Sequence, residues 1–466
     1  MTGAGGAFLG FQWLNKEEDV RFELGEIATL EEPVQSENLE KVQQAYNLIL
    51  NSYVEKVDEN QLIEGAIQGM LATLADPNSE YMDKETVKLF NEALESSFEG
   101  IGAEVSMEEG KVIIVSPFKN SPAEKAGLKP RDHILKVDGE KIEGLDLYEA
   151  TLKIRGKKGT KVELEIVRQG LTKPFKVEVK RDEIPQITVH SELKSHNGED
   201  IGYIEISSFA ENTAKEFFEA LNGLEKKRMD GLIIDVRGNP GGFLESVQDI
   251  LKEFVTKESP YIQIESRNGE KKRYFSNLTK AKEYPIVVLA DKGSASASEI
   301  LAGALSEAQD YPVIGETTYG KGTVQLPVSM GDGSNIKLTL YKWLTPNGNW
   351  IHKEGIKPTI EVKKAEIFNT HPLQIEEVLM IDTNNEQVKN AQEILAALGY
   401  SPGRKDGYFS ESTMFAVRAF QQQTGLEPSG TIDGKTAAAL QEAVRAEMKK
   451  EKNDLQLQTA LRIVTR

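Results

Sequence analysis

Hydrophobic residues recur every three to four positions through residues 36–74, which predicts a pair of amphipathic helices. The segment Asp76-Pro-Asn-Ser79 ends the second helix, because proline cannot continue it. The pattern then changes to short apolar runs separated by Gly and Pro, at 112–115, 134–137, 162–167 and 175–179. Such runs are typical of strands. Residues 101–179 are therefore predicted to form a compact β-rich module.

After residue 200, apolar strands alternate with amphipathic helices. The predicted strands are 201–206, 232–236, 286–290 and 313–315, with helices at 214–226, 244–255 and 298–308, and late strands at 325–328 and 336–344. Alternation of this kind, with continuous apolar strands, predicts an α/β layer of buried parallel strands.

The region after residue 372 contains a short internal repeat. Gly407-Tyr-Phe-Ser-Glu-Ser-Thr413 is matched by Gly430-Thr-Ile-Asp-Gly-Lys-Thr436, and a helix follows each copy. Two equivalent loop–helix units predict a three-helix module formed by near-duplication.

The first residues are apolar and are followed by a charged segment, Lys16-Glu-Glu-Asp19. This order is typical of the second half of a signal peptide or membrane anchor that lacks its basic start, so residues 1–20 are interpreted as its remnant. A frayed apolar N-terminus remains the alternative. No run of about 18 apolar residues occurs that would span a bilayer.

The composition excludes several kinds of chemistry. A chain of 466 residues predicts about three domains at roughly 150 residues each. With 74 acidic and 56 basic residues the net charge is −18, which repels phosphate backbones, so no nucleic-acid partner is expected. Cysteine is absent, which removes disulfides, thiolate catalysis and iron–sulfur clusters. The five histidines show no metal-ligand spacing, so we expect no metal and no cofactor.

The segment Gly293-Ser-Ala-Ser-Ala-Ser-Glu299 lies between an apolar strand and an apolar helix. A hydroxyl at such a strand-to-helix turn is exposed, and helix N–H groups point at what binds beside it. This arrangement suits a nucleophilic serine with an oxyanion site. The same residues also fit a capping box from Ser296 to Glu299, so the motif alone leaves both interpretations open.

A nucleophilic serine needs a base. His190, His196 and His352 have polar or charged neighbours, which favours solvated loop positions. Lys321 is different, because it is flanked by Gly320 and Gly322 among uncharged residues. A closely packed amine loses solvation, which lowers its pKa and allows it to accept a proton. A phosphate-contacting or surface lysine is the open alternative.

Two glycine-containing loops are candidate donors of backbone N–H groups. The first is Asp235-Val-Arg-Gly-Asn-Pro-Gly-Gly242, which ends a strand and offers a second oxyanion donor, although its sequence also fits an ordinary turn. The second precedes a strand and is suited to capture a peptide carboxylate while the peptide adds as an extra strand, or is a simple turn. Its residues are Gly100, Ile101, Gly102 and Ala103.

These segments together resemble the carboxy-terminal processing proteases, S41-type Ser–Lys endopeptidases that carry a PDZ domain, and in particular a Bacillus-type branch. The resemblance rests on Asp76–Tyr81, Gly100–Ala103, Ser121–Leu128, Ile154–Gly156, Asp235–Gly242, Gly293–Glu299 and Gly320–Gln325, all in the family's order. It implies Ser296 as nucleophile, Lys321 as general base and Gln325 as the residue that orients the lysine. Ser294 and Ser298 are then supporting residues.

The resemblance also implies an oxyanion hole made by the amide of Ala297 and that of Gly241 or Gly242, and a PDZ loop at residues 100–103 that binds substrate. Arg155, at the end of a PDZ helix, is the candidate regulatory residue; a helix-end arginine that complements the helix dipole is the alternative. The family often has His where Asn78 stands, outside the catalytic set.

The implied architecture is an α/β protease core of the crotonase-like βα superhelix type with an inserted PDZ domain, an N-terminal helical segment and a C-terminal helical peptidoglycan-binding-like domain. The expected boundaries are 1–20 signal or anchor remnant, 21–96 helical region for dimerisation or capping, 97–181 PDZ, 182–372 protease core, 373–445 peptidoglycan-binding-like domain and 446–466 helix of possible dimerisation.

The resemblance implies protein or peptide substrates with a free C-terminus, a homodimer formed through residues 20–75 and 440–466, and an extracytoplasmic location. Cell-wall contact through the C-terminal domain is expected alongside a structural or dimerising alternative, and a role in signalling proteolysis of spore formers is a further implication. A catalytically silent adaptor and an acyl-CoA enzyme are the competing classes. The intact set Ser296, Lys321 and Gln325 argues against the first, and the lack of a basic phosphate loop argues against the second.

Overall fold

The computed structural model describes residues 37–94, 97–108, 110–145, 147–168, 171 and 173–465. The chain divides into two compact units, Met1–Ala75 and Asp76–Arg466. The predicted signal or anchor remnant lies outside the described residues. In the part of the chain that is described, no helix is both long and apolar enough to cross a membrane.

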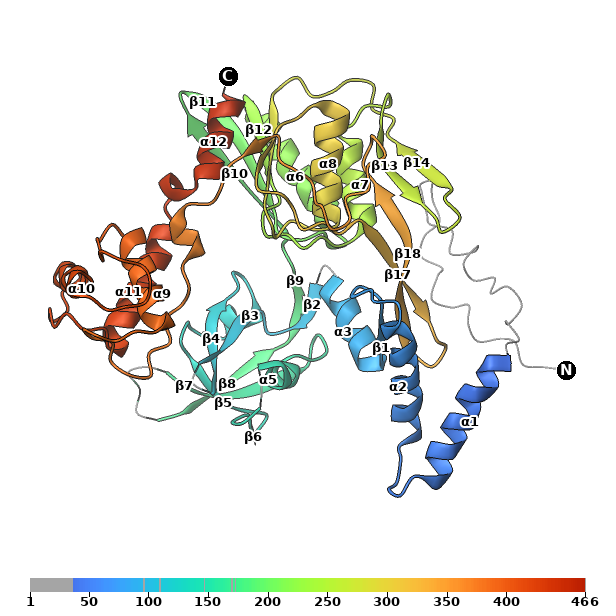
Figure 1. Ribbon diagram of the computed structural model, residues 1–466, viewed down its shortest axis with the longest axis horizontal. Coiled ribbons are helices and arrows are strands. Elements are labelled where there is room, and N and C mark those ends of the chain that lie inside the picture. Colours follow the sequence, from blue (N-terminus) through green and yellow to red (C-terminus); the bar gives the residue numbers. More distant parts are fainter. Residues whose placement is uncertain are drawn as a thin grey trace. The chain divides into compact units, whose positions relative to one another are not determined.

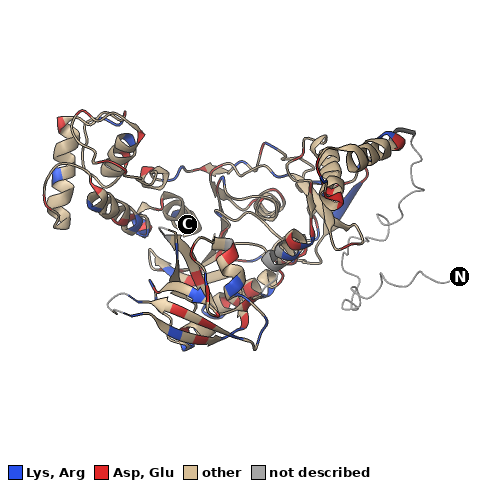
Figure 2. Ribbon diagram, turned by 90° about the horizontal axis from the view of Figure 1, so that it is seen from below, with Lys and Arg blue, Asp and Glu red and all other residues tan. Residues whose placement is uncertain are grey.

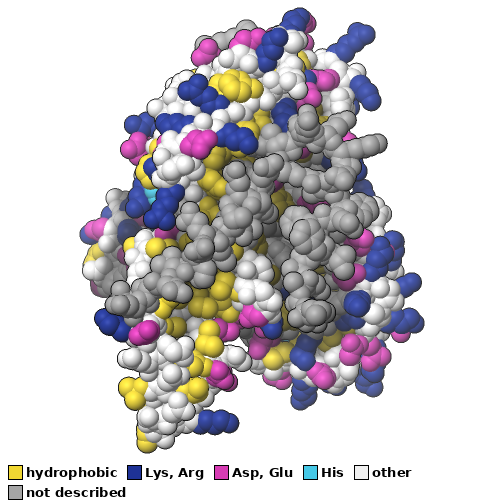
Figure 3. Space-filling model, turned by 90° about the vertical axis from the view of Figure 1, so that its right-hand side faces the viewer, with side chains coloured by type: hydrophobic (Ala, Val, Ile, Leu, Met, Phe, Trp, Pro, Cys, Tyr) yellow, Lys and Arg dark blue, Asp and Glu magenta, His cyan; other side chains and the backbone are white. Residues whose placement is uncertain are grey.

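The described part of the first unit is a helical hairpin, as the periodicity predicted. It consists of α1 (Glu37–Ser52) and α2 (Glu59–Ala72). Asp58 caps α2 by accepting the Gln61 N–H at 3.0 Å. No residue of α2 is buried, and uncovered hydrophobic side chains are visible on the side of the molecule shown in Figure 3. The exposed apolar residues of the hairpin are Leu39, Val42, Leu48, Ile49, Ile63 and Met70.

The second unit contains a β-rich module, whose strands β3 to β8 are seen in Figure 1. Its buried cluster runs from Ile101 to Val179. Its sheet has the order β3-β4-β5-β7-β8, with β6 beside β5, so that β3 is an edge strand. The strands are β3 (Ala103–Glu108), β4 (Lys111–Pro117), β5 (His133–Val137), β6 (Glu140–Lys141), β7 (Lys161–Val167) and β8 (Phe175–Lys180), with helices α4 (Pro122–Lys125) and α5 (Leu147–Ile154).

The module is connected to the rest of the unit by a two-stranded sheet, β2 (Ser97–Gly100) paired with β9 (Asp182–Pro185). Lys and Arg lie beside Asp and Glu on the module's strands (Figure 2), as in the pair between Lys161 on β7 and Glu178 on β8. Exposed pairs of this kind contribute little to stability, typically about 0–1 kcal/mol. The buried apolar cluster therefore supplies most of the stabilisation.

The second half of the unit contains the predicted parallel sheet. Its order is β10-β11-β12-β15-β16-β19, in which β10 alone is antiparallel to its neighbour. Every residue of β12 and β15 is buried, which explains the continuous apolar runs. The strands are β10 (Val189–His196), β11 (Glu199–Ile206), β12 (Gly231–Asp235), β15 (Ile286–Ala290), β16 (Val313–Gly315) and β19 (Ile360–Glu361), and the helices between them are α6 (Thr213–Lys226), α7 (Leu244–Lys252) and α8 (Ala297–Gln309).

A second, antiparallel sheet lies in the same unit and was only partly predicted. Its order is β1-β18-β13-β14, with β17 beside β18. The strands are β1 (Glu80–Met82), β13 (Pro260–Glu265), β14 (Lys271–Phe275), β17 (Thr323–Ser329) and β18 (Asn335–Leu344), and the short helix α3 (Lys84–Leu94) follows β1. The late strands β17 and β18 were expected, whereas β1, β13 and β14 were not.

The C-terminal repeat forms the predicted three-helix module, with α9 (Glu386–Ala397), α10 (Glu411–Thr424) and α11 (Gly434–Met448). Each copy of the repeat has a buried glutamine in its centre. Gln392 accepts the Gly407 N–H at 3.0 Å and donates to the Thr413 hydroxyl at 3.0 Å. Gln421 accepts the Gly430 N–H at 2.9 Å and donates to the Thr436 hydroxyl at 3.1 Å. The Gly-to-Thr spacing therefore reflects one glutamine-centred loop that is built twice.

The last described helix, α12 (Leu455–Val464), packs on the parallel sheet of its own chain, after a short 3-10 turn at Glu451–Asn453. Its buried residues Leu457, Leu461 and Val464 join the cluster formed by strand residues such as Ile233 and Val287. The apolar side of α12 is thus covered within the chain, and dimerisation through 446–466 stays a prediction that this packing does not support.

Candidate active site

Ser296 stands at the turn between β15 and α8, as the sequence predicted. It is the N-cap of α8 and has φ of +53°, an unfavourable conformation for a residue with a side chain. Strain of this kind is tolerated where the surroundings impose it, and it is frequent at catalytic turns. Ser296 remains partly exposed although its neighbours Ala295 and Ala297 are buried. The turn therefore leaves Ser296 partly accessible from solvent.

The fully buried carboxylate of Glu299 holds this turn. Its Oε2 accepts the Ser296 N–H at 2.8 Å, which is the glutamate half of the predicted capping box. The same Oε2 accepts the Lys321 N–H at 2.8 Å, and Oε1 accepts the Gly320 N–H at 2.6 Å and the Thr318 hydroxyl at 2.5 Å. The capping interpretation and the catalytic one therefore do not compete, because the cap itself brings the serine segment to the lysine segment.

The backbone of Lys321 is fixed on its other side by two indoles. Trp343 donates to the Lys321 carbonyl at 2.7 Å, and Trp350 donates to the Gly322 carbonyl at 2.7 Å. Gly322 has no room for a side chain, since a Cβ would lie 2.8 Å from the backbone nitrogen of His352. The close packing expected from the glycines on both sides of Lys321 is therefore present.

Burial lowers the pKa of Lys321 below its ordinary value of 10.5, and the positive charge of Lys337 lowers it further. The carboxylates of Asp76, Glu299 and Glu80 oppose this shift but do not cancel it. Within the described residues, no carboxylate forms an ion pair with the Lys321 ammonium group. The neutral amine, which can accept a proton, is therefore more accessible here than on a surface lysine.

Gln325 lies on β17, and its side-chain nitrogen donates to the hydroxyls of Thr323 at 2.9 Å and Thr339 at 3.0 Å. Thr339 also hydrogen-bonds to the Asp76 carboxylate through its hydroxyl and to Ser79 through its N–H. The Asp-Pro loop is therefore connected to Gln325, a link that the sequence did not reveal. Over the described ranges, no hydrogen bond joins Gln325 to Lys321.

The glycines of the 235–242 turn lie against Ser296. A Cβ on Gly241 would be 2.9 Å from the Ser296 Cβ and 3.1 Å from the Ala297 nitrogen. The Gly241 N–H donates to the Asn239 side chain at 2.8 Å. Gly242 is exposed, and neither its N–H nor that of Ala297 has a protein acceptor in the described part of the chain. These two N–H groups are therefore available to a ligand.

Ser294 and Ser298 connect the serine turn to the glycine turn. The Ser294 hydroxyl donates to the Val236 carbonyl at 2.7 Å, and the Ser298 hydroxyl donates to the Asn239 carbonyl at 2.9 Å. Both side chains are fully buried. Their geometry fits the supporting role that the resemblance implied.

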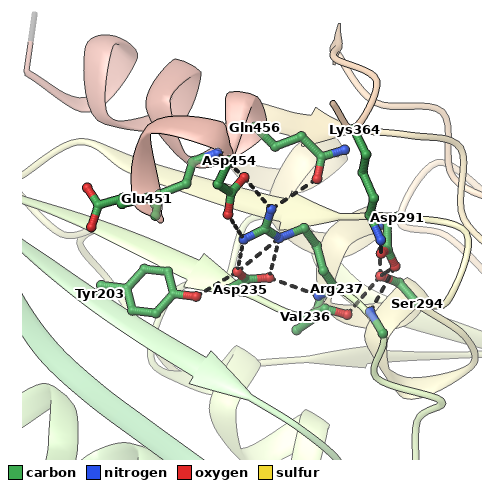
Figure 4. A network of polar contacts seen from close by, with 12 residues as sticks. Tyr203, Asp235, Val236, Arg237, Asp291, Ser294, Lys364, Glu451, Asp454 and Gln456 are labelled. Carbon is green, nitrogen blue, oxygen red and sulfur yellow. Dashed lines mark hydrogen bonds and ion pairs between the residues drawn. The ribbon is translucent and has the colours of Figure 1, made fainter. Parts of the chain in front are cut away.

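Arg237 forms a clamp behind the glycine turn (Figure 4). Its guanidinium group bonds to Asp235 at 2.6 Å and to both carboxylate oxygens of Asp454 at 2.8 Å, and it donates to Gln456 at 3.0 Å. Tyr203 donates to Asp235 at 2.7 Å. Burial raises the pKa of the Tyr203 phenol, and the negative charge of Asp235 raises it further. Sequence reasoning missed this clamp, because Asp454 and Arg237 are far apart along the chain.

The histidines are placed outside this constellation. His190 is exposed on β10, and His196 is half-buried at the end of the same strand. His352 stacks on Trp350 with ring centroids 5.1 Å apart, and its buried Nδ1 has no hydrogen-bond partner among the residues that the structure describes. The expected solvated loop position is therefore wrong for His352. Among the described residues, no group of three or more His, Asp or Glu is placed to hold a metal ion.

The loop at residues 100–103 opens onto the edge strand β3. The carbonyls of Ile101 and Gly102 accept the N–H groups of Ala123 at 2.8 Å and Phe118 at 2.9 Å, so the loop is fixed from its inner side. Helix α5 lies beside β3. An edge strand with a helix alongside is the arrangement that accepts a peptide as an additional strand.

Arg155, directly after α5, is half-buried and not fully solvated. Its guanidinium lies over the ring of Phe98 on β2, 4.8 Å from the centroid. The end of α5 is held by the buried Arg181, whose side chain donates to the Ile154 carbonyl at 2.9 Å and the Lys153 carbonyl at 3.1 Å. Arg155 therefore connects the end of α5 to β2, the strand that leads into the module.

The sequence was compared with known proteins. It is 61% identical over 424 residues to the carboxy-terminal processing protease CtpB of Bacillus subtilis, covering 91% of this chain and 88% of the relative. It is 43% identical over 422 residues to the protease CtpA of the same organism, covering 91% of this chain and 89% of the relative. The chain belongs to the carboxy-terminal processing proteases.

This carboxy-terminal processing protease has recognisable component domains. Residues 200–362 match peptidase family S41, residues 100–179 a PDZ domain, residues 384–440 a peptidoglycan binding domain and residues 1–86 the N-terminal domain of the activating protease CtpB. Among solved structures, a photosystem II D1 C-terminal processing protease is 28% identical, with a TM-score of 0.44, and the match covers 69% of this chain and 86% of that one. The chain is a serine peptidase with a PDZ domain and a peptidoglycan-binding-like domain.

Proposed function

We propose that peptide bonds are hydrolysed by a Ser296–Lys321 dyad. Neutral Lys321 removes the Ser296 proton as Oγ attacks the peptide carbonyl, and the protonated lysine then donates to the leaving amine. Water, activated by the same lysine, hydrolyses the acyl-enzyme and regenerates the serine. The observation that carries this proposal is the shared Glu299 carboxylate, which binds the backbone N–H groups of both residues.

The oxyanion formed in this reaction is stabilised by the N–H groups of Ala297 and Gly242. Both have no protein acceptor in the described ranges, whereas the Gly241 N–H is engaged by Asn239. Gly241 instead supplies the space that lets the turn approach Ser296. Two preorganised donors at a developing negative charge supply a large part of the rate enhancement in acyl transfer.

Gln325 is proposed to orient the Lys321 amine. Its nitrogen is bound by the two hydroxyls of Thr323 and Thr339, which leaves the carbonyl oxygen as the end that can accept from an ammonium group. The Asp76 loop supports this orientation through Thr339. The loop therefore contributes to the orientation of the base through Thr339.

Substrate C-termini are proposed to bind at the loop formed by Gly100, Ile101, Gly102 and Ala103 and to extend along β3. Arg155 is the proposed regulatory residue, because its contact with Phe98 connects the end of α5 to β2, the strand leading into the module. Unchanged peptide-stimulated cleavage by Arg155→Ala would remove this coupling role.

A homodimer is proposed through the apolar side chains of α1 and α2 that are exposed in the described part of their unit, residues 37–75. We also propose an extracytoplasmic location, exported or anchored through the N-terminal segment, cell-wall contact by the C-terminal module and a role in regulated signalling proteolysis. A monomer in sedimentation at micromolar concentration would remove the dimer.

The decisive experiment is cleavage of casein, an unstructured protein, by wild type, Ser296→Ala and Lys321→Ala at mildly alkaline pH. Lys292→Ala is the matched control, because Lys292 lies in the same turn region but is exposed and paired with Glu316. We expect cleavage by wild type and Lys292→Ala alone. Cleavage that survives Ser296→Ala and Lys321→Ala would show that the dyad is wrong.

A further inference from the structure

The C-terminal three-helix module is inserted into the protease core and is not appended to it. The chain leaves the core after β19, forms α9, α10 and α11, and returns to the core as α12. Residues 362–364 form the outgoing connection and residues 454–456 the returning one. The two connections meet, because the Gln456 side chain donates to the Val362 carbonyl at 2.8 Å.

Both connections bind the turn that carries the oxyanion glycine. On the returning side, Asp454 bonds to both outer nitrogens of Arg237 at 2.8 Å, and Gln456 accepts from the same guanidinium at 3.0 Å. Arg237 belongs to the Asp235–Gly242 turn itself. A charged, two-pronged contact of this kind fixes orientation as well as distance.

On the outgoing side, Lys364 forms an ion pair with Asp291 at 2.6 Å. The other oxygen of Asp291 accepts the Gly238 N–H at 2.8 Å and the Gly293 N–H at 2.9 Å. Gly238 lies in the glycine turn and Gly293 in the serine turn. Asp291 therefore links the outgoing connection to both turns that form the proposed oxyanion hole, so a shift of Lys364 is expected to shift both turns.

A cavity of about 270 Å³ lies at this junction. Its lining includes Arg237, Gly238 and Asp291 from the core, Lys364 from the outgoing connection and Asp454 from the returning one. The two ion pairs thus have open space beside them, so they are able to shift without displacing tightly packed side chains. Figure 4 shows the two pairs on either side of the turn.

We infer that Asp454 and Lys364 are positioning residues for the oxyanion hole, through which the placement of the C-terminal module controls the catalytic rate. The inference rests on the proposed role of Gly242 and Ala297. Loss of either ion pair loosens the turn without altering the surface that binds substrate. An interaction realised mainly in the transition state is then weakened, so kcat falls and KM does not.

The test compares Asp454→Asn and Lys364→Gln with two matched controls of the same charge change. Glu451→Gln lies on the returning segment and removes only a pair with Lys194, and Lys363→Gln is the exposed neighbour of Lys364. The side-chain oxygen of asparagine can still accept the Leu457 N–H, as Asp454 does at 3.0 Å, so the N-cap of α12 is kept. We expect kcat for casein-derived peptides to fall about tenfold in both test variants, with KM within about twofold and both controls unchanged.

The outcomes separate this inference from the proposed function. If wild type cleaves, Ser296→Ala does not, and both test variants keep the wild-type kcat, the positioning role is overturned while the dyad stands. A kcat loss that follows only the unfolded fraction, measured by thermal denaturation of each variant, also overturns it. Cleavage by Ser296→Ala would instead overturn the proposed function. Lys364→Gln does not alter α12, so its kcat tests the positioning role even if Asp454→Asn does not fold.

Discussion

The backbone N–H groups of Ser296 and Lys321 donate to the same oxygen, Oε2 of Glu299, each at 2.8 Å. The carboxylate is fully buried, so it has lost its hydration and depends on its protein donors. Glu299 therefore fixes the separation of the serine segment and the lysine segment.

The first prediction concerns Glu299→Gln. The amide of glutamine turns one acceptor into a donor that faces N–H groups, so we expect a loss of about 2–3 kcal/mol of stability and at least a tenfold fall in kcat. Chemical denaturation and peptide cleavage measure the two effects. Glu307→Gln on the same helix, where Glu307 binds the surface Asn347 and Asn349, is the control and should leave both values near wild type.

The second prediction concerns pH. Because burial lowers the pKa of Lys321, and activity needs the neutral amine, kcat should rise with pH and reach half of its maximum below pH 10.5. Lys337 is a positive charge that lowers this pKa. Lys337→Gln should therefore raise the pKa and move the rising limb to higher pH.

The pH–rate profile of wild type and Lys337→Gln measures this directly, with Lys84→Gln as a control at another surface lysine. A limb that stays in place in Lys337→Gln, or one set by a group that titrates well below neutrality, would contradict the assignment of Lys321 as the base.

The third prediction concerns Gly241→Ala. The new Cβ would meet the Ser296 Cβ at 2.9 Å and the Ala295 carbonyl oxygen at 2.8 Å, so the turn must move away from the serine. We expect kcat to fall about 100-fold, the usual cost of losing one oxyanion donor. Gly238→Ala separates this effect from strain alone, since Gly238 also has positive φ but nothing within 4 Å of its added Cβ. Equal losses in the two variants would refute the steric explanation.

The fourth prediction concerns the repeated glutamines. Gln421→Ala leaves the buried Gly430 N–H without its acceptor, and Gln392→Ala does the same to Gly407. Each should destabilise the module by about 1–3 kcal/mol. Thermal unfolding should show this loss for both, and Gln423→Ala, an exposed position that binds Tyr400, should show little.

The parallel sheet was predictable because its strands are buried on both faces and read as unbroken apolar runs, as in β12 and β15. Strands β10 and β14 were missed because they are rich in polar and charged residues. In β10, Val189–His196, the apolar residues do not recur at every second position, so no apolar face is visible in the sequence. In β14, Lys271–Phe275, the first three residues are basic. Their place in a sheet is decided by partners distant in sequence, such as β11 and β13.

The motifs of the sequence point to the serine, lysine and glycine turns, and the structure brings these turns together. The contacts that connect these turns to one another could not be predicted from the sequence. Glu299 was visible only as a capping residue, and nothing local indicates that it also binds Lys321. The Arg237–Asp454 pair joins positions 217 residues apart, and pattern reasoning shows that α12 is amphipathic without showing what covers it.

Because α12 packs on the protease core but follows the three-helix module in the sequence, the core is completed late in synthesis. The parallel sheet that carries the serine and glycine turns is synthesised before the whole three-helix module, and the apolar face that α12 covers stays open until α12 has left the ribosome. Long-range contacts of this kind form late in folding. Arg237 therefore gains its second carboxylate, that of Asp454, only after the whole three-helix module has been synthesised, so this clamp behind the glycine turn forms later than the contacts within the turn itself.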